Sequence, residues 1–114
     1  MKILFILNDP PYGTERVYNG LRLAGALQKN AKVTVFLMAD AVISAKKGQK
    51  TPDGFYNVER MLKKVLLGGG EVLLCGTCMD ARGMAAEDVM EGPARSTMDA
   101  LSAATMEADK VLVF

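Results

Sequence analysis

The residues best able to do chemistry in this sequence are two cysteines separated by two residues, Cys75 and Cys78. The chain has no histidine, which removes Ser-His-Asp and Cys-His nucleophile pairs, histidine general bases and histidine metal ligands. The two cysteines alone supply only two zinc ligands, so a zinc site would need a second chain. A single pair also falls short of the disulfide framework of a small secreted protein. The pair therefore favours nucleophilic sulfur chemistry, and we expect no metal and no cofactor.

The turn that carries the cysteines suits a thiolate. An apolar run over Glu71–Leu74 predicts a buried strand that leads into the first cysteine, and Cys78 falls in the first turn of the short helix expected next. Free backbone N–H groups and the positive end of a helix dipole favour a negative sulfur there. Arg82 follows in the next turn and adds a positive charge. Gly76 and Thr77 make the turn a binding element, which argues against the alternative of two inert, buried thiols.

A second polar loop, Asn8–Thr14, follows the first strand and leads to a helix N-terminus, where anions commonly bind. It has neither the glycine spacing nor the Lys-Ser/Thr end of a Walker A loop. A rigid Pro-Pro turn with locally satisfied side chains is an equally good interpretation. We expect Asn8, Asp9 and Tyr12 to line a binding crevice close to Cys75.

Hydrophobic periodicity and turn residues divide the chain into alternating strands and helices. Buried strands are predicted over Ile3–Leu7, Lys32–Ala39, Glu71–Leu74 and Lys110–Phe114. Helices are predicted over Glu15–Leu27 (capped by Thr14), Asp40–Ala45, Tyr56–Leu67 and Ala94–Ala108, with short helical turns within 76–83 and 84–92. The basic, glycine-rich segment Lys46–Gly54 is expected to be a mobile loop.

Alternation of this kind predicts a single α/β domain over residues 1–114, with a flavodoxin-like parallel sheet of four or five strands and helices on both faces. The expected strand order is 2-1-3-4. Ligand sites in such sheets lie beyond the carboxyl ends of the strands, where the strand order reverses. That order would bring the loops at residues 8–14 and 75–83 together.

Composition restricts the partners. Fourteen Lys and Arg residues oppose thirteen Asp and Glu residues, so a net charge of +1 predicts no nucleic-acid binding through a basic face. The apolar start, Met1–Leu7, is too short to span a membrane and has no cleavage site, so we expect a cytoplasmic protein without a membrane partner. Hydrophobic residues make up 50% of so small a chain, which suggests apolar surface covered by further copies.

The sequence resembles the DsrE/DsrF-like (YchN-like) sulfur-relay family over essentially its whole length. The resemblance rests on the order and spacing of three groups of residues: Asn8-Asp9-Pro10-Pro11-Tyr12-Gly13-Thr14-Glu15-Arg16 with Asn19 and Arg22, Lys46-Lys47-Gly48-Gln49, and Cys75-Gly76-Thr77-Cys78 with Arg82-Gly83.

This resemblance implies a flavodoxin-like fold and a homo-oligomer, often a hexamer built from trimers or dimers. Some family members carry persulfide sulfur on a cysteine that, by its distance from the Arg-Gly pair, matches Cys75. Cys78 would then be an assisting or resolving thiol. Sulfur donor and acceptor proteins would be the partners, and the chain would be a sulfur carrier or a sulfurtransferase.

Three functions follow from these observations. In the first, Cys75 carries sulfane sulfur as a persulfide and passes it to a partner thiol. In the second, the chain is a non-catalytic oligomeric binding or regulatory module with an anion or nucleotide crevice at the carboxyl ends of the strands. In the third, Cys75 and Cys78 form a reversible disulfide switch.

Overall fold

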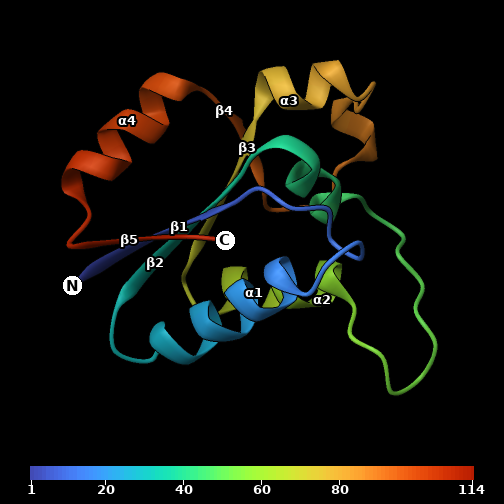
Figure 1. Ribbon diagram of the computed structural model, residues 1–114, viewed down its shortest axis with the longest axis horizontal. Helices are drawn as coiled ribbons and strands as arrows, with labels where there is room; N and C mark the ends of the chain where they lie inside the picture. Colours follow the sequence, from blue (N-terminus) through green and yellow to red (C-terminus); the bar gives the residue numbers. More distant parts are fainter.

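A single sheet of five parallel strands runs through the computed structural model, which describes residues 1–114 (Figure 1). The strands are β1 (Lys2–Leu7), β2 (Lys32–Leu37), β3 (Glu71–Cys75), β4 (Ala94–Ser96) and β5 (Lys110–Val113). Their order across the sheet is β4-β3-β2-β1-β5. Apolar runs in β1 and β2 place Phe5, Leu7, Phe36 and Leu37 fully inside the core, as expected for parallel strands covered on both faces.

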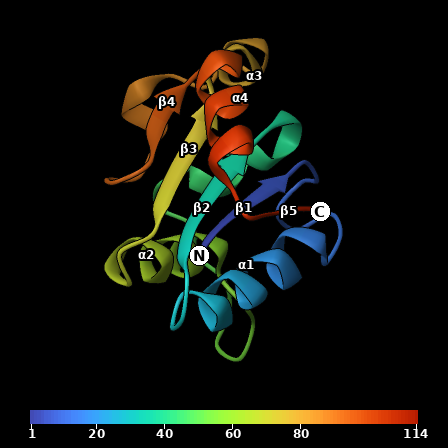
Figure 2. The ribbon, with the colours of Figure 1, turned by 90° about the vertical axis from the view of Figure 1, so that its left-hand side faces the viewer.

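Helices cover both faces of this sheet, which confirms the α/β prediction. The helices are α1 (Arg16–Leu27), α2 (Val58–Leu67), α3 (Gly76–Ala81) and α4 (Met98–Glu107), and the 3-10 segments are η1 (Ala39–Ala45) and η2 (Ala86–Asp88). Figures 1 and 2 show α1 and α2 side by side on one face and α4 on the other, with α3 beyond the end of β3. None of these helices combines the length and the apolar character needed to cross a membrane.

The predicted strand order was wrong. β1 pairs with β2 and β5, while β2 lies between β1 and β3. The last strand therefore returns to the far side of β1 and does not extend the sheet beyond β3. Periodicity finds the strands but carries no information about which parallel neighbours they choose, because every crossover helix can reach either side.

The segment after Pro93 also differs from the prediction of one helix over Ala94–Ala108. Residues 94–96 form β4, which pairs with the end of β3, and α4 begins only after Thr97, whose hydroxyl accepts the N–H of Ala100. Met98, the first residue of α4, has 63% of its surface exposed. The short helix expected within 84–92 is a single 3-10 turn, η2. Helix α1 starts at Arg16, one residue later than predicted, and the Thr14 hydroxyl accepts the backbone N–H of Arg16 at 3.3 Å.

Candidate functional site

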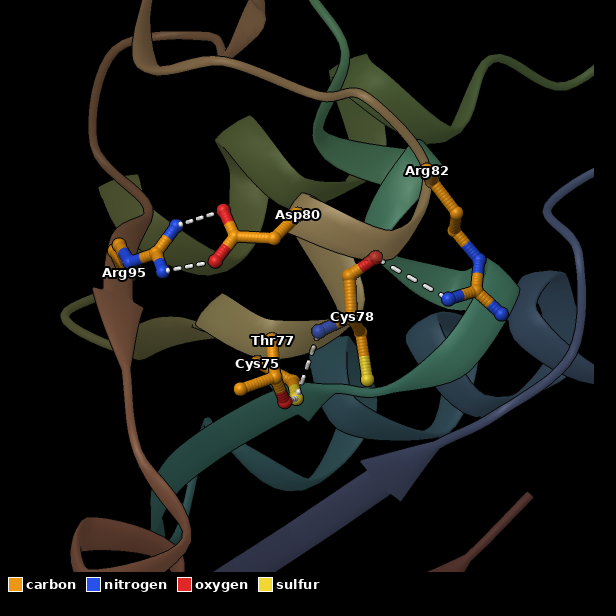
Figure 3. A network of polar contacts seen from close by, with 6 residues as sticks. All are labelled: Cys75, Thr77, Cys78, Asp80, Arg82 and Arg95. Atoms are coloured by element: carbon orange, nitrogen blue, oxygen red, sulfur yellow. Dashed lines mark hydrogen bonds and ion pairs between the residues drawn. The ribbon is translucent and has the colours of Figure 1, made fainter.

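Cys75 is the last residue of β3, and its sulfur receives hydrogen bonds from the turn that follows. The backbone N–H of Cys78 donates to Sγ of Cys75 at 3.4 Å, and the hydroxyl of Thr77 lies 3.3 Å from the same sulfur (Figure 3). These contacts arise because the chain turns from strand to helix at Cys75, which is the N-cap of α3. Backbone N–H groups in the first turn of α3 have no acceptor within the helix, and the N–H of Cys78 therefore points at the sulfur.

These contacts separate the acidities of the two thiols, which are both free cysteines. Burial opposes ionisation of Cys75, but hydrogen bonds from the Cys78 thiol, the Thr77 hydroxyl and two backbone N–H groups outweigh it and lower the pKa of Cys75. The pKa of Cys78 is raised by burial and by the hydrogen bond that its thiol donates to Cys75. Of the two thiols, Cys75 therefore loses its proton at the lower pH.

Cys75 lines a cavity of about 210 Å³ although the residue is only 8% exposed. The cavity lies between the ends of β2, β3 and β4 and the first turn of α4. Its lining combines an apolar side with several hydroxyl groups and one guanidinium, and consists of Phe36, Met38, Cys75, Gly76, Thr77, Arg95, Ser96, Thr97 and Met98. The residue that carries the hydrogen-bonded thiol therefore borders a space large enough for a small reagent.

The two arginines near this site lie on opposite sides of α3 (Figure 3). Arg82, predicted to stabilise the sulfur anion, instead binds Asp40 at 2.7 Å and the carbonyl oxygen of Cys78 at 3.2 Å. It ties α3 to η1 and has no hydrogen bond to Cys75. Arg95, which sequence reasoning missed, lines the cavity together with the sulfur and is held by Asp80.

The polar loop after β1 does not line this cavity, contrary to the prediction. Asn8 bonds the terminal carbonyl of Phe114, and Asp9 accepts the hydroxyl of Thr14. Tyr12 bonds Gln49 and accepts the backbone N–H of Val58. The observed strand order explains the separation, since β2 lies between β1 and β3 and adjacent strands are about 4.8 Å apart.

Comparison with known proteins places this geometry in a family. The family model described as DsrE/DsrF-like matches residues 1–114. Protein YchN of Escherichia coli K12 is 40% identical to this chain over 99% of the chain and 98% of its own length. The chain belongs to the DsrE/DsrF-like family. An uncharacterised protein of Methanopyrus kandleri is also 40% identical, over 98% of the chain and 93% of its own length.

Solved structures agree with this membership in the DsrE/DsrF-like family. The crystal structure of YchN from E. coli superimposes with a TM-score of 0.94 at 40% identity, covering 100% of this chain and 99% of that one. A structure from Bacteroides thetaiotaomicron, described as a conserved protein of unknown function, has a TM-score of 0.75 at 15% identity over 99% of this chain and 94% of its own. The second likeness shows that the fold persists at low sequence identity.

Proposed function

We propose that this DsrE/DsrF-like chain handles sulfane sulfur, with Cys75 as the carrier. The observation that carries the proposal is a thiol with a lowered pKa that faces a cavity and accepts hydrogen bonds from its own turn. A thiolate is the nucleophilic form of cysteine, and it reacts fastest when it is both ionised and accessible. Membership in the family supports a sulfur-relay type of role.

The proposed transfer has two steps. The thiolate of Cys75 attacks the outer sulfur of a donor persulfide, the donor's S–S bond breaks, and the donor leaves as a thiolate. An acceptor thiolate then attacks the outer sulfur now on Cys75, and Cys75 leaves as a thiolate again. Thr77 and the N–H of Cys78 stabilise the negative sulfur in both its loaded and unloaded forms. No net oxidation or reduction occurs.

Mass spectrometry after incubation with a low-molecular-weight persulfide tests the proposal. We expect a mass gain of one sulfur atom, located at Cys75 by peptide mapping. Cys75→Ser should lose this adduct, whereas Cys78→Ser should keep it because serine retains a hydroxyl donor beside the sulfur. An adduct that survives Cys75→Ser, or no adduct on the wild-type protein, contradicts the proposal.

The same measurements distinguish the two competing functions. A non-catalytic binding module predicts slow alkylation of native Cys75 by iodoacetamide, at a rate no higher than that of a model thiol with a pKa of about 8.5. A disulfide switch predicts that oxidant removes both free thiols together and that reductant restores them. The carrier proposal predicts fast alkylation of Cys75 while Cys78 stays slow.

Self-association is part of the proposal, and a bare apolar face supports it. Phe114 stacks on Phe5 on the α1 side of the sheet, so alternation places Val111 and Val113 on the opposite side. These two valines are 39% and 59% exposed. Light scattering should give a multiple of 12.3 kDa, and Val113→Asp should shift it toward the monomer. A wild-type monomer at micromolar concentration contradicts this part.

A further inference from the structure

The cavity in front of Cys75 holds the groups that bind small anions. The hydroxyls of Thr77, Ser96 and Thr97 and the guanidinium of Arg95 share its lining with the sulfur. Hydroxyls and guanidinium groups donate hydrogen bonds, and Arg in particular matches the oxygens of carboxylates and oxyanions. Three short polar side chains and one cation thus surround a space that also contains a nucleophile.

Arg95 is held in a defined position beside that space. Two hydrogen bonds, at 2.9 and 2.8 Å, join its terminal nitrogens to the carboxylate of Asp80. A Cβ atom at Gly76 would come within 2.7 Å of the Arg95 Nε, so the absence of a side chain at Gly76 allows the guanidinium to lie against the backbone of the sulfur-bearing turn. The position of Arg95 therefore depends on two residues of α3, Gly76 and Asp80.

The charges around the cavity favour an anion. No carboxylate lines it. Asp80 binds Arg95 but is not a lining residue, and Asp99 lies in the first turn of α4 without lining the cavity. The N-terminus of α4, a helix of ten residues capped by Thr97, also borders the cavity, and its first N–H groups have no partner within the helix.

The size of the cavity restricts the ligand further. Sites for drug-sized ligands typically span about 300–1,000 Å³, and this cavity measures about 210 Å³. It has room for a molecule of a few heavy atoms. A compound with a transferable sulfur next to a compact anionic group satisfies the size, the charge and the reactive atom together.

We propose that Arg95, Thr77 and the hydroxyls of Ser96 and Thr97 form an anion subsite, and that small sulfane-sulfur oxyanions of the thiosulfate type load Cys75 directly. This inference rests on the proposed carrier role of Cys75. The thiolate attacks the outer sulfur of thiosulfate, the S–S bond of thiosulfate breaks, and sulfite leaves with the bonding electron pair. The product is the Cys75 persulfide, and no external oxidant or reductant is needed. Arg95 acts as a substrate-positioning residue that holds the anionic group.

Alkylation by two reagents of similar size but different charge tests the subsite. Iodoacetate is anionic and iodoacetamide is neutral, so the ratio of their rates at Cys75 cancels the thiolate population and reports the local charge. Arg95→Gln should lower this ratio roughly threefold, the magnitude typical of one partly exposed ion pair. Arg82→Gln removes the same charge on the other side of α3 and serves as the matched comparison, with a much smaller change expected. Equal changes in the two variants would overturn the subsite, because they would reflect net charge alone.

Loading with thiosulfate completes the test and separates the two proposals. Wild-type protein incubated with thiosulfate should gain one sulfur atom at Cys75 and release sulfite in equal amount, and Arg95→Gln should slow this loading. A neutral dialkyl trisulfide provides the comparison: Cys75 attacks its central sulfur, an alkyl thiolate leaves, and a mixed trisulfide remains on Cys75. Arg95→Gln should slow this reaction less than it slows loading by thiosulfate, because only thiosulfate carries the anionic group. Loading by the trisulfide but not by thiosulfate would overturn the anion subsite and leave the carrier role standing. Failure of both donors would overturn the carrier role itself.

Discussion

The loops at the carboxyl edge of the sheet form two regions that use their polar groups in opposite ways. In the sulfur region, the Thr77 hydroxyl and the N–H of Cys78 lie against the sulfur of Cys75, and Arg95 lines the same cavity as Cys75. In the aromatic region Tyr12 and Tyr18 both stack with Tyr56, with ring centroids 5.7 and 4.1 Å from its ring. Both regions follow strand ends, yet only the first leaves a reactive atom facing open space.

Hydrogen bonding explains the difference. In the aromatic region two of the three phenols have a structural partner: Tyr12 bonds Gln49 and the N–H of Val58, and Tyr56 donates to Glu15 at 2.7 Å. These bonds attach the segment before α2 to the loop after β1. In the sulfur region the donors converge on a group whose charge changes during reaction. The proposed function therefore assigns the chemistry to the sulfur region and a stabilising role to the aromatic region, and three predictions test this division.

The largest expected effect is loss of stability from Tyr56→Ala. The substitution removes two stacked pairs, each contributing about 0.5–1.5 kcal/mol beyond area burial, together with the bond to Glu15. We expect the free energy of unfolding to fall by about 2 kcal/mol in urea titrations, with no change in the native alkylation rate of Cys75. Tyr56→Phe, which keeps both stacks, should lose much less. A changed Cys75 rate in folded Tyr56→Ala would show that the regions are coupled.

The next effect, in the opposite region, is loss of reactivity from Thr77→Val. The hydroxyl stabilises the thiolate, and a hydrogen bond to a charged group contributes about 1.5 kcal/mol or more, which corresponds to a roughly tenfold smaller thiolate population near neutral pH. The pH profile of iodoacetamide alkylation should shift to higher pH, while the urea midpoint barely changes. Thr14→Val makes the same exchange beside Asp9 and should leave the profile unchanged. Equal profiles for wild type and Thr77→Val would contradict the role of this hydroxyl.

Sequence reasoning recovered the elements of this fold better than their arrangement. Apolar runs and helical spacing are local signals, so they identified β1, β2, β3 and β5 and helices on both faces. Strand order depends on contacts far apart in the chain, such as the pairing of Ile3 with Lys110, and no local pattern reports them. The wrong strand order led directly to a wrong prediction about the site, because it placed Asn8, Asp9 and Tyr12 beside Cys75.

The sulfur site shows the same limit at the scale of one side chain. The spacing of Cys75 and Cys78 after a strand was sufficient to predict hydrogen bonds from the turn to the sulfur. Arg95 was missed because the apolar spacing of the following helix was extended back to Ala94, which hid an edge strand. One local signal was available: Thr97 is a preferred N-cap residue, and a helix that starts after it leaves Arg95 extended beside β3.

The smallest effect is expected at high pH and belongs to the aromatic region. The hydrogen bond to Glu15, then burial and the charge of Glu15, raise the pKa of Tyr56 from 10.0 to about 12. The folded chain therefore holds this proton more tightly than the unfolded chain, so its stabilising contribution is complete below pH 10 and is lost as the pH rises toward 12. In a spectrophotometric titration, Tyr56→Phe should remove the phenolate absorbance that appears last. Glu15→Gln should move that step to lower pH while Cys75 alkylation stays at the wild-type rate; a step that stays in place would show that Glu15 does not hold the proton.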